Sequence, residues 1–282
     1  MKKIAVIGIC GKSVFLGCDK FPARGESIVC NSLHTEPGGK GVNTAITVKR
    51  LGGDVSYLVS LGNDEYGKEC ISFFEREKLR VKYNVKNGAT DYGVVLHNGD
   101  GNNCVSVFID DKIKLTENDV AEFETELKEA SYVAVSAEVS DGVLLKTAEI
   151  CEKYGTKIIF DPSPVREIPD EFLKKVWLFT PNETEFENLF KKITPENAVI
   201  TLGGKGAILI EKGKRTEFPT VSVNVKNTTG AGDVFNGALC YSLSIGNDLS
   251  ESVKFAMRVA AYKVSCQYVI EGIPTLKELK YD

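Results

Sequence analysis

The sequence predicts an α/β protein with a mainly parallel sheet, and three observations lead to that prediction. Short runs of apolar and β-branched residues recur along the 282-residue chain. Helical patterns with capping residues at their starts lie between many of these runs. The runs are apolar throughout rather than alternating, which is typical of strands buried on both faces. Strands that alternate with helices usually form a parallel sheet covered by helices on both sides.

The predicted elements follow in a regular order. The strand runs are Ile4–Ile9, Val55–Leu61, Tyr132–Ser136, Lys157–Phe160, Val176–Thr180, Ala198–Leu202 and Ala207–Glu211. Helical patterns cover Val42–Leu51, Asp64–Lys78, Glu117–Glu129 and Asp141–Lys153. The second helix begins with an aspartate, and Thr116 and Ser140 precede the last two, which are residue types that cap helix N-termini.

Two segments break this alternation and predict a small second sheet. Residues 12–36 are rich in glycine, proline and polar residues and carry only weak strand patterns, such as SIVCNSLH. Residues 88–110 predict a β-hairpin, with strands Gly93–His97 and Cys104–Ile109 on either side of the turn sequence NGDGNN. Because both are β-rich insertions in an α/β chain, they could together form a sheet that projects from the main body.

Composition and charge exclude several functional classes. The formal charge of −4 and the pI of about 5.5 leave no basic footprint for nucleic acid. No apolar run approaches the roughly 20 residues of a membrane helix, and the run after Lys3 ends too early, at Gly11, for a signal peptide. Eight scattered cysteines without a CxxC pair, with two histidines, exclude zinc spacing and favour reduced thiols in a cytoplasmic protein.

The motif NTTGAGDVFNGAL, residues 227–239, places small residues beside one carboxylate. The strand-like run VSVNV at 221–225 leads into it and a helical pattern follows, so residues 230–232 lie at a predicted helix N-terminus. Free N–H groups and the helix dipole favour an anion there, and small residues let a phosphate reach the backbone. Asp233 could then deprotonate an attacking hydroxyl, as in phosphoryl transfer. A plain strand-to-helix turn explains the same residues.

A second glycine cluster, EPGGKGVNTAI, also opens a helix. Gly38, Gly39 and Gly41 permit close backbone approach. Lys40 and Asn43 supply hydrogen-bond donors near a polar ligand. A tight turn with a solvated lysine is the alternative interpretation.

Three shorter motifs are ambiguous. The start VIGICGKS resembles the end of a Walker A loop, but Val6 stands where that loop needs glycine, so an enzyme using Lys12 in this way is the least favoured alternative. In TPNETEFENL, Thr180 or Asn182 can cap a helix, and the acids that follow could hold Mg²⁺ through water. TLGGKGAIL is a turn between two strands that could hold phosphates or be a simple hairpin.

The motifs PGGKGVNTAI, PNETE, TLGGKG and NTTGAGDVFNGAL occur here in the order found in the ribokinase-like (PfkB) carbohydrate kinases. The resemblance runs from Ile4 to about Gln267. It implies a ribokinase-like α/β/α sandwich with a mainly parallel central sheet and a small β-rich lid. It further implies one kinase domain over 1–282, with lid segments at about 12–36 and 88–110. The implied reaction transfers the γ-phosphate of ATP, with Mg²⁺, to a hydroxyl of a sugar or sugar-like substrate.

The resemblance also carries site roles onto matching positions. The general base would be Asp233, and the anion hole would be formed by Gly230, Ala231 and Gly232. The sugar site would be lined by Gly38, Gly39, Lys40 and Asn43. The groups near Mg²⁺ and the phosphates would be Asn182 and Glu185. The nucleotide would lie along Thr201 and the loop from Gly203 to Gly206.

Two departures from the family pattern affect ion and substrate. Asn227 stands where the family motif usually begins with an aspartate that, in cation-activated members, helps to hold a monovalent ion. Asparagine keeps an oxygen ligand for potassium but loses the charge, which argues against potassium as a further cofactor. Gly11 and Ser13 stand where ribokinases carry an Asn and an Asp that bind sugar hydroxyls.

Several substrates and one silent role therefore stay open. Ribose or a related pentose comes first, followed by another sugar, a nucleoside or a sugar phosphate. A catalytically silent relative that binds sugar or nucleotide is the alternative from another class. Because lid sheets of this family often pair, a homodimer through the lid is also expected.

Overall fold

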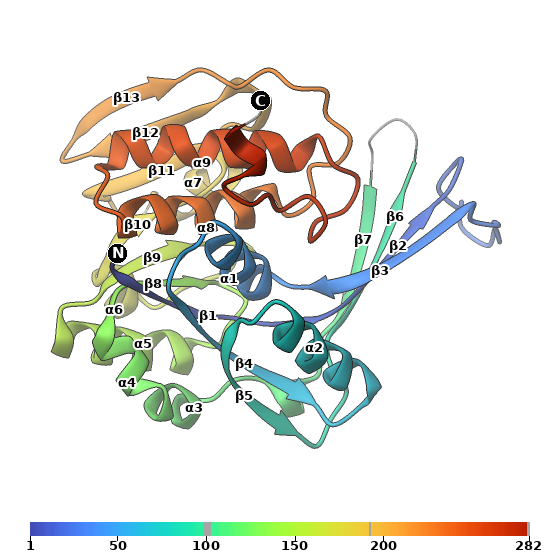
Figure 1. Ribbon diagram of the computed structural model, residues 1–282, viewed down its shortest axis with the longest axis horizontal. Coiled ribbons are helices and arrows are strands. Elements are labelled where there is room, and N and C mark those ends of the chain that lie inside the picture. Colours follow the sequence, from blue (N-terminus) through green and yellow to red (C-terminus); the bar gives the residue numbers. More distant parts are fainter. Residues whose placement is uncertain (99–102, 192, 281–282) are drawn as a thin grey trace.

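In the residues that the computed structural model describes, 1–98, 103–191 and 193–280, nine strands form one central sheet in the order β13-β12-β11-β10-β9-β8-β1-β4-β5 (Figure 1). Their bounds are β1 (Lys3–Ile7), β4 (Val55–Gly62), β5 (Arg80–Lys86), β8 (Ala130–Ser136), β9 (Lys157–Asp161), β10 (Val176–Phe179), β11 (Asn197–Thr201), β12 (Ala207–Glu211) and β13 (Lys214–Phe218). The pairings from β5 to β11 are parallel, whereas β11–β12 and β12–β13 pair antiparallel.

Helices cover both faces of this sheet, so its strands are buried on both sides. One face packs against α1 (Lys40–Arg50), α2 (Glu65–Arg76), α8 (Ala231–Ser244) and α9 (Leu249–Val264). The other packs against α3 (Glu117–Glu122), α4 (Glu124–Glu129), α5 (Asp141–Tyr154), α6 (Asp170–Leu173) and α7 (Glu183–Leu189). Alternate residues of β1 enter the two cores, Val6 on the first side and Ile7 on the second. This confirms the predicted α/β class and explains the continuous apolar runs.

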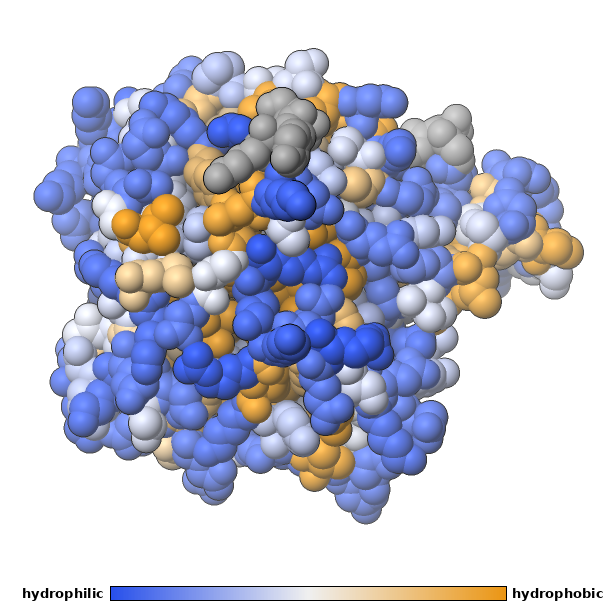
Figure 2. Space-filling model, in the orientation of Figure 1, coloured by the Kyte–Doolittle hydropathy of each residue, from blue (hydrophilic) through white to orange (hydrophobic). Residues whose placement is uncertain are grey.

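A second sheet, called the lid here, projects from one side of the body (Figure 1). Within the described residues its strand order is β3-β2-β6-β7. The bounds are β2 (Gly11–Gly17), β3 (Ser32–Gly38), β6 (Tyr92–His97) and β7 (Asn103–Phe108). The predicted hairpin corresponds to β6 and β7, although residues 99–102 of its turn lie outside the described residues. Figure 2 shows hydrophobic surface on this projecting part.

Some local predictions are wrong. Residues 221–225 form no strand, because their alternating valines find no partner strand and border a cleft instead. The strand that precedes the motif is β13, a charged edge strand. The helix predicted over 117–129 is divided at Phe123, whose backbone leaves the helical conformation while its ring is fully buried. Of residues 27–34, only the last three belong to a strand.

Two findings concern the cysteines and the helix lengths in the described residues. The eight cysteines all lie in the described residues and are free thiols. Of the helices that the structure describes, none is both long enough and apolar enough to span a membrane. Three short 3₁₀ helices complete this part of the chain, at η1 (Asp111–Ile113), η2 (Gly203–Lys205) and η3 (Glu278–Lys280).

Candidate active site

A cleft of about 1230 Å³ lies between the lid and the carboxyl ends of the parallel strands. Parallel sheets bind ligands at this edge because the loops there carry polar side chains toward one crevice. From the sheet side the cleft is bordered by residues at or just after strand ends, namely Ile9, Glu138, Asp161, Thr180 and Thr201. From the lid it is bordered by Ser13, Phe15, Tyr92, Val95, Val105 and Val107. All the predicted site residues border it except Asn227.

The N-terminus of α8 opens into the cleft. Gly230 caps the helix with a φ of 73°, in the left-handed region that favours glycine. A Cβ on Gly230 would lie 2.6 Å from Cγ1 of Val269, so only glycine fits there. A Cβ on Gly232 would have no described atom within 4 Å, so open space lies in front of the first turn. Such a helix start, with accessible N–H groups, is suited to an anion.

Asp233 stands in the first turn of α8, 6% exposed, and faces α1. Nδ2 of Asn43 donates a hydrogen bond to its Oδ2 at 2.8 Å. The hydroxyl of Thr44 donates to its backbone oxygen at 3.3 Å. α1 and α8 can approach closely because Gly237 has no side chain. A Cβ on Gly237 would lie 2.5 Å from Cβ of Thr47. The motif glycine at 237 therefore has a packing role that holds the carboxylate in position.

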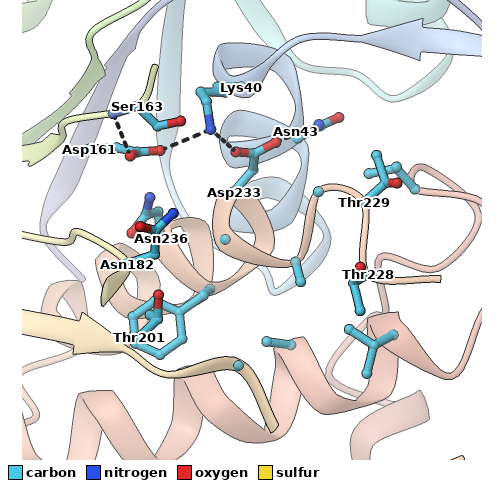
Figure 3. A pocket seen from close by; sticks show the side chains of 18 of the residues that line it. Lys40, Asn43, Asp161, Ser163, Asn182, Thr201, Thr228, Thr229, Asp233 and Asn236 are labelled. Atoms are coloured by element: carbon cyan, nitrogen blue, oxygen red, sulfur yellow. Dashed lines mark hydrogen bonds and ion pairs between the residues drawn. The ribbon is translucent and has the colours of Figure 1, made fainter. Parts of the chain in front are cut away.

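Lys40 contacts two carboxylates of the cleft, Asp233 and Asp161. Its Nζ lies 3.4 Å from Oδ1 of Asp233 and 3.4 Å from Oδ2 of Asp161, as Figure 3 shows. The backbone N–H of Lys40 donates to Oε2 of Glu138 at 3.2 Å. Neither Asp161 nor Glu138 was predicted from the sequence. The available signal was their position one or two residues after predicted strands, where acids face the crevice of a parallel sheet.

These carboxylates share one low-polarity environment, and their pKa values show it. Burial raises the pKa of Asp161 to about 6, with Lys40 opposing the shift and Asp233 adding to it. Burial likewise raises the pKa of Glu138 to about 8. Burial alone would lower the pKa of Lys40, but the carboxylates, Asp233 first, raise it above its ordinary value. The cleft therefore holds a permanent cation among acids that resist a full set of negative charges.

A capping box fixes Asn182 and Glu185 at the start of α7. Oδ1 of Asn182 accepts from the backbone N–H of Glu185 at 2.9 Å. Glu185 in turn accepts from the backbone N–H and the amide of Asn182, both at 2.8 Å. This confirms Asn182 as the cap. A backbone bridge to Thr201 places the same residue beside the end of β11.

The β11–β12 turn forms the far end of the cleft. Gly203 and Gly206 have φ values of 54° and 105°, and a Cβ on Gly206 would lie 2.0 Å from the carbonyl oxygen of Phe218. Glycine is therefore required by the tight turn at 206. The cleft also has apolar lining residues, namely Val221, Val223, Val225, Met257 and Ala260. This apolar lining could not be predicted from the sequence, because its members come from a strand-like run and from a helix that was not predicted.

The glycines predicted to line the sugar site are also constrained by packing. Gly39, the N-cap of α1, has a φ of 125°, and a Cβ there would lie 2.6 Å from the carbonyl oxygen of Ile9. A Cβ on Gly38 would lie 1.8 Å from Oγ of Ser13, and one on Gly11 would lie 2.1 Å from the carbonyl oxygen of Asp91. Oδ1 of Asn43 is buried and has no partner among the described residues. It is an acceptor that a bound hydroxyl can satisfy.

Lys12 does not belong to a phosphate-binding loop. It lies in β2, a strand that pairs with both β3 and β6 and is followed by no helix. Its ammonium forms an ion pair with Glu69 and lies 5.4 Å from the ring centroid of Tyr66. The Walker A alternative is therefore wrong.

Asn227 lies in the turn before α8, outside the cleft lining. Its Oδ1 accepts from the backbone N–H of Thr229 at 2.9 Å, and its Nδ2 donates to the carbonyl oxygen of Gln267 at 2.7 Å. The hydroxyl of Thr229 also accepts from Nδ2 of Asn103 in β7 at 3.2 Å. The turn before α8 thus touches both the segment after α9 and the lid.

Comparison with known proteins agrees with this arrangement over nearly the whole chain. Residues 1–276 match the model of the pfkB family of carbohydrate kinases. A ribokinase of Bacillus subtilis is 30% identical over 291 residues, covering 99% of each chain. The crystal structure of a ribokinase from Thermotoga maritima has a TM-score of 0.85 at 27% identity and covers 100% of this chain and 99% of its own.

A further solved structure shows the same fold with ligands. The Arabidopsis thaliana ribokinase, described as complexed with ribose and ATP, has a TM-score of 0.84 at 24% identity. It covers 99% of this chain and 98% of its own. The ordered motifs, the sheet order and the lid agree with these matches. The chain therefore belongs to the ribokinase-like PfkB family of carbohydrate kinases, which transfer a phosphoryl group to an alcohol.

Proposed function

We propose that this protein transfers the γ-phosphate of ATP to a hydroxyl of ribose or a related pentose. The observation that carries the proposal is the buried carboxylate of Asp233 beside the open N-terminus of α8. A proton acceptor and an anion-binding helix start are the two parts that phosphoryl transfer needs side by side. The similarity to the Bacillus subtilis ribokinase supports the choice of a pentose.

In this mechanism Asp233 accepts the proton of the sugar hydroxyl as its oxygen attacks the γ-phosphorus. A bond forms between that oxygen and phosphorus, and the bond from phosphorus to the ADP oxygen breaks. Backbone N–H groups at 230–232 face the developing charge on the phosphoryl oxygens. Asn43 holds the carboxylate in orientation through its hydrogen bond of 2.8 Å. Lys40 provides a cation that lets the polyphosphate enter a cleft rich in acids.

The donor set fits Mg²⁺ bound mainly through water and phosphate. Mg²⁺ prefers oxygen ligands and commonly uses one or two carboxylates with substrate phosphates. Glu185 and Asp161 both border the cleft, and the described residues contain no cluster of three or more acids, histidines or cysteines that would enclose an ion. We assign the Mg²⁺ side to Glu185, held by Asn182, with Asp161 nearby. When bound, the ion neutralises charge on the phosphates.

For ATP we assign the end of the cleft at the β11–β12 turn. Thr201, Gly203 and Gly206 supply backbone and hydroxyl groups, and the valines of 221–225 supply an apolar face for the base. Binding sites of this kind combine an apolar lining with a few placed polar groups. The Arabidopsis thaliana structure is described as complexed with ribose and ATP, which supports binding of a sugar and a nucleotide by this fold.

A nucleoside is the second candidate substrate, and the lid favours it. Phe15, Val95, Val105 and Val107 border the cleft and offer apolar contact to a base. Gly11 brings no side chain and Ser13 only a hydroxyl, so this wall offers few hydrogen bonds to a sugar.

The lid also suggests how two copies could pair. Its outer strands carry exposed apolar residues, among them Leu33 on β3 and Phe108 on β7. Exposed edge strands with apolar side chains are surfaces on which another chain can pair. We therefore propose that the whole chain acts as one kinase domain and dimerises through its lid. A cytoplasmic location stays a prediction, based on the reduced cysteines.

The test is ADP release from MgATP across a panel of pentoses, hexoses, nucleosides and sugar phosphates. We expect a pentose to give the highest kcat/KM and a sugar phosphate to give the lowest. Turnover with a nucleoside alone would replace the pentose by the second candidate. Binding of ATP and sugar with no turnover of any compound would contradict the proposal and favour a silent binding protein.

A further inference from the structure

Lys263, in the last turn of α9, has a fully buried side chain, 0% exposed. Lysine is almost never fully buried unless its charge is paired or hydrogen-bonded. The ammonium donates a hydrogen bond to the backbone carbonyl oxygen of Asn227 at 2.9 Å. Its direct partner is thus a neutral carbonyl, and this costly burial calls for an explanation.

The carbonyl that Lys263 binds belongs to the turn that sets the anion-binding helix start. From Asn227 the chain runs through Thr229, whose N–H donates to the side chain of Asn227 at 2.9 Å, to the N-cap Gly230. The ammonium therefore lies behind this turn, on the side away from the cleft. A positive charge there adds to the helix dipole in favouring a phosphoryl group in front.

The last residue of α9 and the segment after it contact the same turn from the other side. The carbonyl oxygen of Val264 accepts from the backbone N–H groups of Lys226 and Asn227, at 2.7 and 3.2 Å. The carbonyl oxygen of Gln267 accepts from the amide of Asn227 at 2.7 Å. Glu36 of the lid strand β3 accepts from the N–H groups of residues 269 and 270, at 2.8 and 3.0 Å.

These contacts do not fit a bound monovalent cation. Such an ion needs several free oxygen ligands, and those around Asn227 already accept from protein donors. Its carbonyl accepts from Lys263, its Oδ1 accepts from Thr229, and its Nδ2 occupies the carbonyl of Gln267. The turn therefore combines a neutral amide at Asn227 with the buried ammonium of Lys263.

We propose that the ammonium of Lys263 is a built-in cation that organises the turn 227–230, so that phosphoryl transfer by this chain needs no potassium. The inference rests on the proposed function, because it assigns a positioning role in the same reaction. Lys263 touches neither substrate nor phosphate and acts through the backbone of Asn227.

The charge on Lys263 is supported by its surroundings. Burial lowers the pKa of Lys263 to about 8, while Glu36, Cys266 and Asp233 oppose that shift. The ammonium therefore remains mostly protonated at neutral pH. These three groups act on the ammonium electrostatically from different elements. Glu36 lies on the lid strand β3, Asp233 on α8, and Cys266 in the segment after α9.

The first arm of the test uses the unmodified protein. Turnover and MgATP affinity are measured in potassium chloride and in choline chloride at equal ionic strength. We expect equal values of both in the two salts. Activation by potassium of more than about threefold, which corresponds to well under 1 kcal/mol, would overturn the proposal. Absence of turnover in both salts would contradict the proposed function instead, and equal MgATP affinity would still support the built-in cation.

The second arm removes the charge. We expect Lys263→Met to lower kcat by at least about tenfold with little change in the KM for ATP, which is less than the ~10²-fold or greater loss typical of a direct donor. Lys254→Met, on the exposed face of the same helix, is the matched control and should retain normal kcat. The double variant N227D/K263M should gain activation by potassium. A Lys263→Met protein that folds, by its melting curve, and keeps normal kcat in choline would overturn the proposal.

Discussion

The central sheet and the lid face the same cleft but bring different chemistry to it. The body contributes charged groups on buried elements, among them Asp161, Asp233 and Lys40. The lid contributes mainly apolar and small residues such as Phe15 and Val107. The charged groups of the cleft are therefore held on buried elements of the body, whereas the lid contributes a mainly apolar wall. We infer that the body performs the reaction and the lid selects what enters.

The largest effect is expected at the proposed base in the body. Asp233→Asn keeps the shape of the side chain but removes the proton acceptor, so kcat should fall at least ~10²-fold. The affinity for ATP should change little, as calorimetric titration would show. Asp248→Asn is the matched control, because Asp248 caps α9 outside the cleft. Near-normal kcat in Asp233→Asn would remove the general base from the mechanism.

The next effect concerns the open space before α8. Gly232→Val would fill the space in which no described atom lies within 4 Å of a Cβ, so a phosphate could no longer approach the N–H groups. We expect kcat/KM for ATP to fall about tenfold or more, because a phosphate held farther away loses part of contacts whose complete removal typically costs ~10²-fold or more each. Gly232→Ala should show a smaller loss. Equal kcat/KM for both variants and the unmodified protein would contradict the anion site.

A smaller effect links the acids of the body to stability. The pKa of Glu138 is raised from 4.5 to about 8, so the folded state binds more protons than the unfolded state between those values. Its contribution to stability is present below pH 4.5 and is lost as pH rises toward 8. The melting temperature is measured at pH 5 and pH 8, which lie at roughly the two ends of that window. Its decrease from the lower to the higher pH should be smaller in Glu138→Gln than in the unmodified protein. An equal decrease in melting temperature in both proteins would contradict the raised pKa of Glu138.

The smallest effect on turnover is expected at the outer face of the lid. Leu33 is 67% exposed and does not border the cleft. Leu33→Asp should therefore leave kcat unchanged and weaken a lid-mediated dimer, because a charge placed in a pairing surface is costly. Light scattering across a dilution series measures the mass. A dimer of unchanged affinity would place the subunit contact elsewhere.

Burial decides which parts of the fold could be predicted. The strand predicted at Val55–Leu61 is found at Val55–Gly62, because a strand covered on both faces must be apolar throughout. Strands β5 and β13 lie at the sheet edges and carry charged residues, so they left no apolar run to detect. The valines at 221–225 had the right alternation, but a sequence pattern cannot show whether a partner strand is present.

The candidate site was predictable where one short motif contains it. Asp233 and its small neighbours lie within seven residues of Asn227. The glycines among them indicate that a ligand can approach the backbone closely. Asp161 and Glu138 could not be found in this way, because they meet Lys40 only through the order of strands in the sheet. Lys263 was equally hidden, since the helix that buries it was not predicted.

The division between body and lid can be tested in one measurement. Two accepted substrates that differ by one hydroxyl are compared, with kcat/KM determined for the unmodified protein, Asp233→Asn and Ser13→Ala. We expect Asp233→Asn to lower both values by the same factor, whereas Ser13→Ala should change their ratio by about tenfold, the scale of one lost hydrogen bond. A changed ratio of the two kcat/KM values in Asp233→Asn, together with an unchanged ratio in Ser13→Ala, would contradict this division between body and lid.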